Sequence, residues 1–286
     1  MGDSKGAITL VARRTKLRTS AQRNPAQSEP ERRILAPRLH LYPSFRSQFL
    51  PDPRDIFVHL PPGYDENPDR GYPVLYMQDG QNLFTQQGPT PNWNLDQTAD
   101  AAMQAGEIEP LLLIGIANTG PRRLAEYTPT ADWKMGGGEA DNYGLLLTEE
   151  LLPFLATQYR IKPGPANTGL GGSSLGALAT LYLGLRHQET FGKLAVLSPS
   201  VWWNHRAILA LVAEADLRHR PRVWLDIGSA ETARAVPDAD LLESRLRAKG
   251  WHPGLDLSYH HIPGGTHDES SWAQRVQPML RFLFPA

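Results

Sequence analysis

The stretch Gly172-Ser173-Ser174-Leu175-Gly176 places two serines between glycines, where a strand pattern gives way to a helix pattern. It fits G-x-S-x-G, in which a serine on a strained strand-to-helix turn projects its hydroxyl above a sheet. Both flanking glycines are needed because larger side chains would clash at such a turn. Ser174 has a glycine two positions away on each side, whereas Ser173 has Leu175 on one side. Ser174 is therefore the predicted nucleophile.

A second glycine pattern, Gly169-Leu170-Gly171, also fits the opening of a dinucleotide-binding turn. That site requires an acidic residue about 20 positions further on, at the end of the next strand. Glu189 comes before the next strand pattern, at 193–197, rather than after it. The sequence therefore disfavours a nucleotide-binding site.

A nucleophilic serine needs a base and a group that orients the base. His267 lies in the glycine-rich stretch PGGTHDESSW, between the last predicted strand and the last predicted helix, and is the predicted base. Glu231 follows the strand pattern 222–228, while Asp226 lies inside that strand and is directed towards a helix layer. We favour Glu231 as the acid; Asp226, or a dyad without an acid, are the alternatives. The chain order of nucleophile, acid and base is that of α/β-hydrolases.

An acyl-transfer site also needs donors for the oxyanion that forms during attack. Gly80 follows a predicted strand and allows a tight turn that directs the Gln81 N–H at a carbonyl oxygen. The Leu175 N–H at the start of the predicted helix is the second expected donor. The alternative interpretation of the first turn is an ordinary Asp-Gly turn.

The elements that must position these residues follow an α/β pattern. Strand patterns occur at 38–42, 55–60, 73–78, 111–117, 168–172, 193–197, 222–228 and 257–262, and helix patterns at 141–159, 175–187, 205–217, 239–249 and 270–284. Alternating strands and helices predict a mostly parallel central sheet of about eight strands, with helices on both faces. Asp141 is the expected N-cap of the helix at 141–159, and Pro153 is expected to bend that helix or begin a new turn.

Residues 35–286 are predicted to form one catalytic domain. Residues 1–34 are rich in Lys and Arg and are predicted to be a flexible extension, with a targeting or anion-binding tail as the alternative. They lack the apolar core of a secretory signal, which favours a cytoplasmic location.

The composition excludes several function classes. The formal net charge of the 286 residues is −1, which gives no indication of nucleic acid or an anionic membrane as partner. No apolar stretch reaches the length of a membrane span. The absence of cysteine excludes disulfides, thiolate metal sites and cysteine nucleophiles. The sequence carries no indication of oligomeric state.

Five stretches together resemble the esterase D or putative-esterase family of α/β-hydrolases, which includes feruloyl and acetylxylan esterases, enterochelin esterases and mycolyltransferases. The similar stretches are 54–84, 92–100, 122–130, 171–203 and 264–272, and the likeness extends over residues 38–285. The resemblance implies ester hydrolysis with Ser174 as nucleophile and His267 as base, and an acid after the penultimate strand, consistent with Glu231. Such a mechanism requires no metal or organic cofactor.

The substrate is predicted to be a small-molecule ester, hydrolysed by a serine carboxylesterase. Trp202 and Trp203 follow a predicted strand and either line a substrate pocket or fill the core. Arg123 and Glu126 are expected to pair, and the glycine-rich stretch 133–144 is expected to cover the site. An acyltransferase and a non-catalytic binding protein are the alternative functions.

Overall fold

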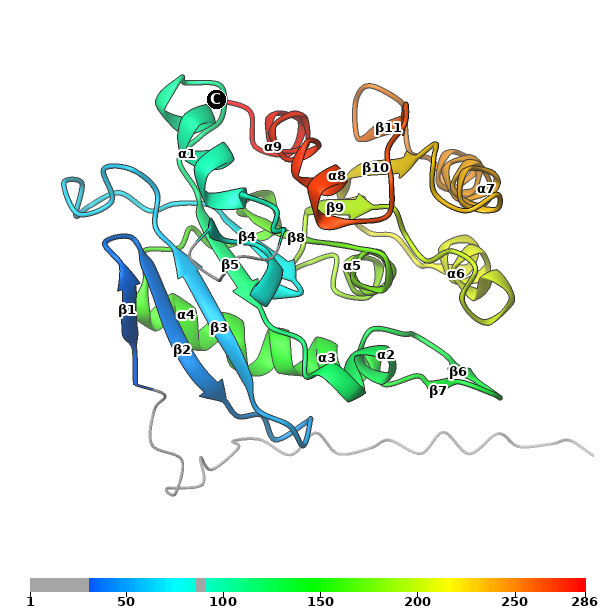
Figure 1. Ribbon diagram of the computed structural model, residues 1–286, viewed down its shortest axis with the longest axis horizontal. Helices are drawn as coiled ribbons and strands as arrows, with labels where there is room; N and C mark the ends of the chain where they lie inside the picture. The colour runs from blue at the N-terminus through cyan, green and yellow to red at the C-terminus, as the bar shows by residue number, and fades with distance from the viewer. Residues whose placement is uncertain (1–30, 86–90) are drawn as a thin grey trace, which may run out of the picture.

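The computed structural model describes residues 31–85 and 91–286, which build one α/β unit (Figure 1). Most of the predicted extension, residues 1–30, lies outside the described residues. The last residues of that predicted extension are described, and the first strand begins among them, at Arg33.

Nine strands of the described chain form one sheet, in the order β1-β2-β3-β5-β4-β8-β9-β10-β11. They are β1 (Arg33–Ala36), β2 (Leu39–Phe45), β3 (Arg54–His59), β4 (Val74–Gln78), β5 (Leu112–Ile116), β8 (Thr168–Ser173), β9 (Lys193–Leu197), β10 (Arg222–Gly228) and β11 (Leu257–Ile262). The strands from β5 through β4 to β11 are parallel, and β1, β2 and β3 join antiparallel at one edge. The predicted α/β-hydrolase fold is confirmed. The ninth strand, β1, was missed because its residues are largely exposed and leave no alternating pattern.

Helices cover both faces of this sheet, as predicted. They are α1 (Leu95–Gln104), α2 (Arg123–Glu126), α3 (Ala140–Leu145), α4 (Leu152–Gln158), α5 (Leu175–Arg186), α6 (Trp203–Glu214), α7 (Ala235–Ala248), α8 (Glu269–Ala273) and α9 (Val276–Leu283). Alternate residues of β4 belong to different cores. Val74 and Tyr76 pack in the core under α3 to α7, whereas Leu75 and Met77 pack in the core under α1, α8 and α9.

The expected helix at 141–159 differs from the observed structure. It consists of α3, a π-helical segment at Leu146–Leu151 and α4. Asp141 is not the N-cap, because the helix starts at Ala140; its carboxylate instead accepts a hydrogen bond from Tyr182 at 2.7 Å. Pro153 lies in the first turn of α4, directly after the π-helical segment, so a new α-helical turn begins there.

Two other segments contain elements or breaks that the sequence did not predict. The glycine-rich stretch contains part of a small hairpin, β6 (Ala131–Asp132) and β7 (Gly136–Gly137), which lies against the start of α6. The predicted helix at 270–284 is divided into α8 and α9, and Arg275 lies between them.

Candidate active site

Ser174 lies on the sharp turn between β8 and α5, with φ 57° and ψ −123°. A side chain on either flanking glycine would collide with β4: a Cβ on Gly172 would lie 2.9 Å from the Gln78 Cβ, and one on Gly176 would lie 3.0 Å from it. An added Cβ at either position would therefore push this turn away from β4. Ser173, the weaker candidate, is buried at the end of β8.

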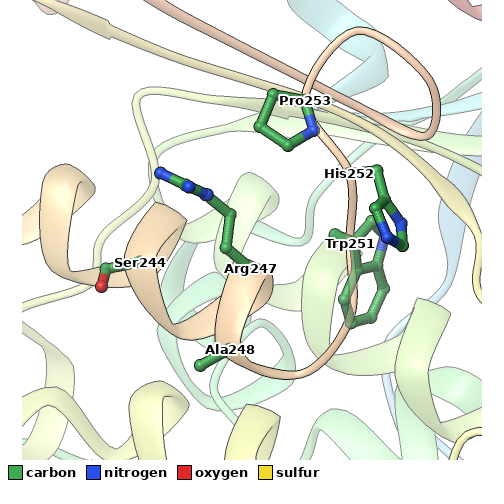
Figure 2. Close-up of a pocket in the computed structure, with 6 residues that line it drawn as sticks. All are labelled: Ser244, Arg247, Ala248, Trp251, His252 and Pro253. Atoms are coloured by element: carbon green, nitrogen blue, oxygen red, sulfur yellow. The ribbon is translucent and has the colours of Figure 1, made fainter.

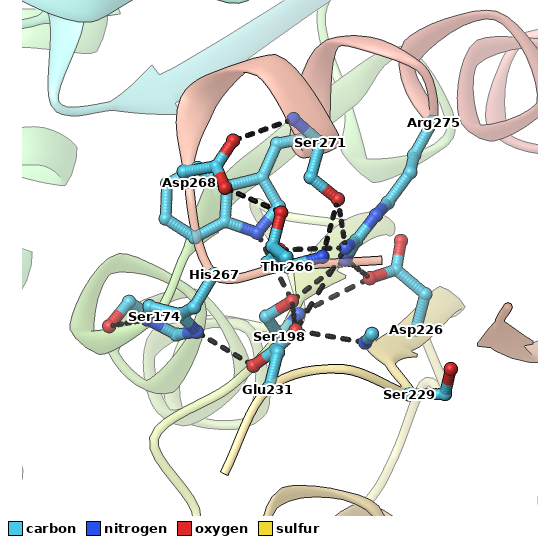
Figure 3. Close-up of polar contacts among 12 residues, drawn as sticks. Ser174, Ser198, Asp226, Ser229, Glu231, Thr266, His267, Asp268, Ser271 and Arg275 are labelled. Carbon is cyan, nitrogen blue, oxygen red and sulfur yellow. Dashed lines mark hydrogen bonds and ion pairs between the residues drawn. The ribbon is translucent and has the colours of Figure 1, made fainter. Parts of the chain in front are cut away.

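The structure brings Ser174, His267 and Glu231 together from three separate loops (Figure 3). His267 Nε2 lies 2.9 Å from Ser174 Oγ, and His267 Nδ1 lies 2.7 Å from Glu231 Oε2. The His267 side chain is 43% exposed and the Glu231 side chain only 3%. The acid is therefore held inside the protein, while the imidazole edge remains accessible.

Three donors hold the Glu231 carboxylate. Besides His267, the Ser198 hydroxyl donates to Oε1 at 2.6 Å and the Gly228 N–H donates to Oε1 at 2.8 Å. Burial alone would raise the pKa of Glu231, but these hydrogen bonds outweigh it and lower the pKa below its ordinary value. The carboxylate is consequently ionised at neutral pH.

Asp226, the alternative acid, is fully buried and does not contact His267. Its Oδ1 lies 2.7 Å from Arg275 Nη1, and its Oδ2 accepts a hydrogen bond from Trp224 Nε1 at 2.7 Å. From its place within β10, its carboxylate points at Arg275 rather than at His267 (Figure 3).

The turn expected to carry an oxyanion donor follows β4 as a short 3-10 segment, Gly80–Asn82. A Cβ on Gly80 would lie 2.5 Å from the Gly115 carbonyl carbon, so only glycine allows this approach to β5. A Cβ on Gly176 would lie 3.3 Å from Asp79 Oδ2, which shows that the turn packs against the start of α5. Leu175 is the first residue of α5, and an N–H at this position has no acceptor within its helix.

Arg123 holds this turn and does not pair with Glu126, so the expected ion pair was wrong. Its Nε and Nη2 lie 2.7 and 2.8 Å from the two oxygens of Asp79. Glu126 pairs with Arg54 at 2.9 Å, and both side chains are buried. The true partner of Arg123 is distant in sequence, which no local spacing rule indicates.

The two tryptophans after β9 have opposite surroundings. Trp203 is a core residue rather than a pocket residue, and its Nε1 donates to the Thr130 carbonyl at 2.9 Å. Trp202 is 49% exposed and lines a hollow of about 490 Å³ together with Met135 and Arg234. The residues that line this hollow do not include Ser174, His267 or Glu231. Ser200, two residues before Trp202, does reach Ser174, with 3.3 Å between the two Oγ atoms.

Another hollow, of about 530 Å³, lies at the end of α7 (Figure 2). Its lining residues are Ser244, Arg247, Ala248, Trp251, His252 and Pro253. It shares no residue with the group around Ser174.

Within residues 31–85 and 91–286, no group of three or more His, Asp or Glu side chains is arranged to hold a metal ion. No helix in the same ranges is long and apolar enough to cross a membrane.

Sequence reasoning missed Ser198 and Arg275, which surround Glu231. Ser198 directly follows β9, and the carboxyl ends of parallel strands are where ligands gather, so its position offered a signal. Arg275 offered none, because in the sequence it lies inside one predicted helix and resembles any surface arginine.

The "Putative esterase" family model matches residues 47–283 of the chain. The uncharacterized protein YbbA of Bacillus subtilis is 29% identical over 184 residues, which cover 62% of this chain and 69% of that protein. The iron(III) enterobactin esterase of Dickeya dadantii is 29% identical over 258 residues, covering 84% of this chain and 53% of that protein.

A solved structure shows the same fold. The BES protein from Bacillus cereus matches with a TM-score of 0.73 at 23% identity, covering 91% of this chain and 100% of that chain. The family match extends over most of the chain, from just after β2 to the end of α9. The chain therefore belongs to the esterase family and is an ester hydrolase of the α/β-hydrolase type.

Proposed function

We propose that the protein hydrolyses small carboxylic esters through an acyl-enzyme on Ser174, with His267 as general base and Glu231 as orienting acid. The observation that carries this proposal is the continuous hydrogen-bonded chain from Ser174 Oγ through both ring nitrogens of His267 to Glu231 Oε2. A hydroxyl is a weak nucleophile until a positioned base accepts its proton, and this chain supplies such a base.

In the first half of the reaction, His267 Nε2 accepts the Ser174 proton while Oγ attacks the ester carbonyl carbon. Glu231 stabilises the imidazolium that forms. The tetrahedral oxyanion accepts hydrogen bonds from the Leu175 and Gln81 N–H groups. When the intermediate collapses, the carbon–oxygen bond to the alcohol breaks, and the alcohol leaves with the proton from His267.

Water completes the cycle by the same route. His267 removes a proton from water, the resulting hydroxide attacks the acyl-enzyme carbonyl, and Ser174 Oγ leaves with the proton that His267 returns. The products are one carboxylic acid and one alcohol, and the enzyme is regenerated.

We further propose that the hollow beside Trp202 holds part of the ester. An exposed indole with Met135 beside it offers an apolar wall for a ring-bearing acyl or alcohol group. The relative named for enterobactin supports an organic ester of this kind as substrate. Trp203, which the sequence predicts either to line a pocket or to fill the core, is buried in the core and does not form part of this wall.

The test is hydrolysis of p-nitrophenyl esters, from acetate to long chains, by the wild type and Ser174→Ala. We expect kcat to fall at least about a thousandfold, the scale of losing a nucleophile. Ser173→Ala is the matched control, because this neighbouring hydroxyl is buried in β8, and it should keep its activity. Activity that survives in Ser174→Ala would contradict the proposal. Acyl transfer to an added alcohol with slow hydrolysis would identify an acyltransferase instead.

A further inference from the structure

Arg275 is a buried cation that the proposed chemistry does not use. Its side chain is 1% exposed and lies between α8 and α9. Nη1 donates to Asp226 Oδ1 and to Ser198 Oγ, both at 2.7 Å. Nη2 donates to Ser271 Oγ at 2.9 Å and to the Thr266 carbonyl at 3.2 Å. Asp226 compensates the buried charge. The contacts with Ser198 and Thr266 connect Arg275 to the residues around Glu231 and His267 (Figure 3).

On the acid side, Arg275 acts in two ways: Nη2 forms a direct ion pair with Glu231 Oε1 at 3.9 Å, and Nη1 contacts Ser198. The Ser198 Oγ is within hydrogen-bond distance of Glu231 Oε1, Arg275 Nη1 and Trp272 Nε1. Guanidinium and indole nitrogens only donate, so the hydroxyl must accept from both of them. Its single hydrogen is then committed to Glu231. Arg275 and Trp272 therefore fix the direction in which Ser198 holds the acid.

On the base side, the contact runs through the Thr266 carbonyl, one residue before His267. Two glycines make room for it: a Cβ on Gly265 would lie 2.9 Å from Arg275 Nη2, and one on Gly228 would lie 2.3 Å from the Gly265 carbonyl oxygen. The loop after β10 and the loop after β11 thus pack directly on each other beside the guanidinium.

We propose, building on the function proposed above, that Arg275 is a positioning residue that links the acid loop to the base loop. It holds Glu231 through Ser198 and through their direct ion pair, and it holds the His267 loop through Thr266. In this way it aligns the imidazole with Ser174. A simple structural ion pair would need only Asp226. The planar guanidinium is suited to this role because it donates in several fixed directions, which an ammonium group cannot reproduce.

The test compares Arg275→Lys and Ser198→Ala with the control Arg38→Lys. Arg38 also makes a two-pronged pair, with Asp100, but it lies at the opposite edge of the sheet. Kinetics are measured on p-nitrophenyl esters, at a temperature where circular dichroism shows that each variant is folded. We expect kcat to be lowered by up to about 100-fold in both test variants. KM should stay within about twofold, and the control should match the wild type. Ser198→Ala removes one oxygen and keeps the test valid if Arg275→Lys does not fold.

A second readout does not depend on esterase activity. The proton on His267 Nδ1, hydrogen-bonded to Glu231, should give a low-field NMR signal that is assigned by its loss in His267→Gln. We expect this signal to move upfield or broaden in Ser198→Ala, because the carboxylate is less firmly held. If the wild type has no esterase activity, the proposed function is overturned, and the NMR signal alone then decides the role of Arg275. If the wild type is active, an unchanged kcat in the test variants would overturn the positioning role. If the wild type is inactive, an unchanged NMR signal would overturn it.

Discussion

Glu231 combines burial with three hydrogen-bond donors, and this has a consequence for stability as well as for catalysis. Its pKa in the folded protein is lowered, so the folded state binds fewer protons at this site than the unfolded state. The ionised carboxylate therefore contributes stability at neutral pH. That contribution is lost as the pH falls through the lowered pKa.

We predict that Glu231→Gln lowers kcat by about 10²–10⁴, because an amide does not stabilise the imidazolium of His267 as a carboxylate does. The variant should also be less stable than the wild type at pH 7. The difference in the free energy of unfolding, measured by urea titration, should shrink as the pH falls below about 4.3, the ordinary value for glutamate.

The exposed Glu66 provides the control for this prediction, and Glu66→Gln should leave both kcat and stability unchanged. A difference in the free energy of unfolding that stays constant from pH 7 to acid pH would contradict the role assigned to the ionised carboxylate.

At the residue scale, the sequence predicts best where the rule is local. The need for glycine around Ser174 follows from the turn itself, and the structure shows the steric reason at Gln78. The burial of Trp203 could not be predicted, because an indole suits either a core or a pocket. The pairing of Arg123 with Asp79 joins the turn after β4 to α2, a contact that depends on the assembled fold.

The packing of α5 against β4 holds the turn of Ser174 beside the turn of Gln81. A Cβ on Gly176 would push against both Gln78 and Asp79. We predict that Gly176→Ala displaces these two turns relative to each other and lowers kcat by about 10²–10³, the scale of losing one oxyanion donor. Steady-state kinetics on p-nitrophenyl esters measures this.

Gly184→Ala is the matched control on the same helix, since a Cβ there would lie 2.4 Å from Leu194 in the core. Overpacking of this kind costs about 1–3 kcal/mol of stability. Gly184→Ala should therefore lower Tm and leave kcat near the wild-type value. Equal kcat values in the two variants would mean that the packing of α5 against β4 does not position the oxyanion turn.

At the element scale, the buried parallel strands were predicted from their continuous apolar runs, and β4, β5 and β9 lie where those runs occur. The irregular elements were not predicted. The π-helical segment between α3 and α4 preserves the apolar spacing of one long helix, so periodicity alone does not reveal it. The hairpin of β6 and β7 is too short to produce a pattern.

For the whole molecule, the described residues that gather around Ser174 run from the turn after β4 to Arg275. We predict that removing residues 1–30 leaves kcat and Tm unchanged. Removing residues 1–37 also deletes β1, which pairs with β2 through Arg33 and Leu41. This exposes the unpaired edge of β2, and we expect a lower Tm and aggregation. Thermal unfolding and ester hydrolysis measure both effects. A loss of activity on removing residues 1–30 would show that this segment contributes to the site.

The overall architecture was predictable because strand and helix patterns alternate along most of the chain. The order of the strands in the sheet was not predictable, because the place of β5 between β3 and β4 depends on contacts between distant segments. The antiparallel edge strand β1 was not predictable, because its residues are largely exposed and its sequence therefore shows no burial pattern.

The position of Arg275 between the last two helices has a consequence for biosynthesis. The chain is made from its N-terminus, so the peptide carrying Ser174 leaves the ribosome before the loop of His267 and well before Arg275. On the proposed mechanism, hydrolytic competence is therefore acquired only after the segment that carries His267 and Arg275 has been made. A message that terminates before this segment is expected to yield an inert product rather than a partly active one.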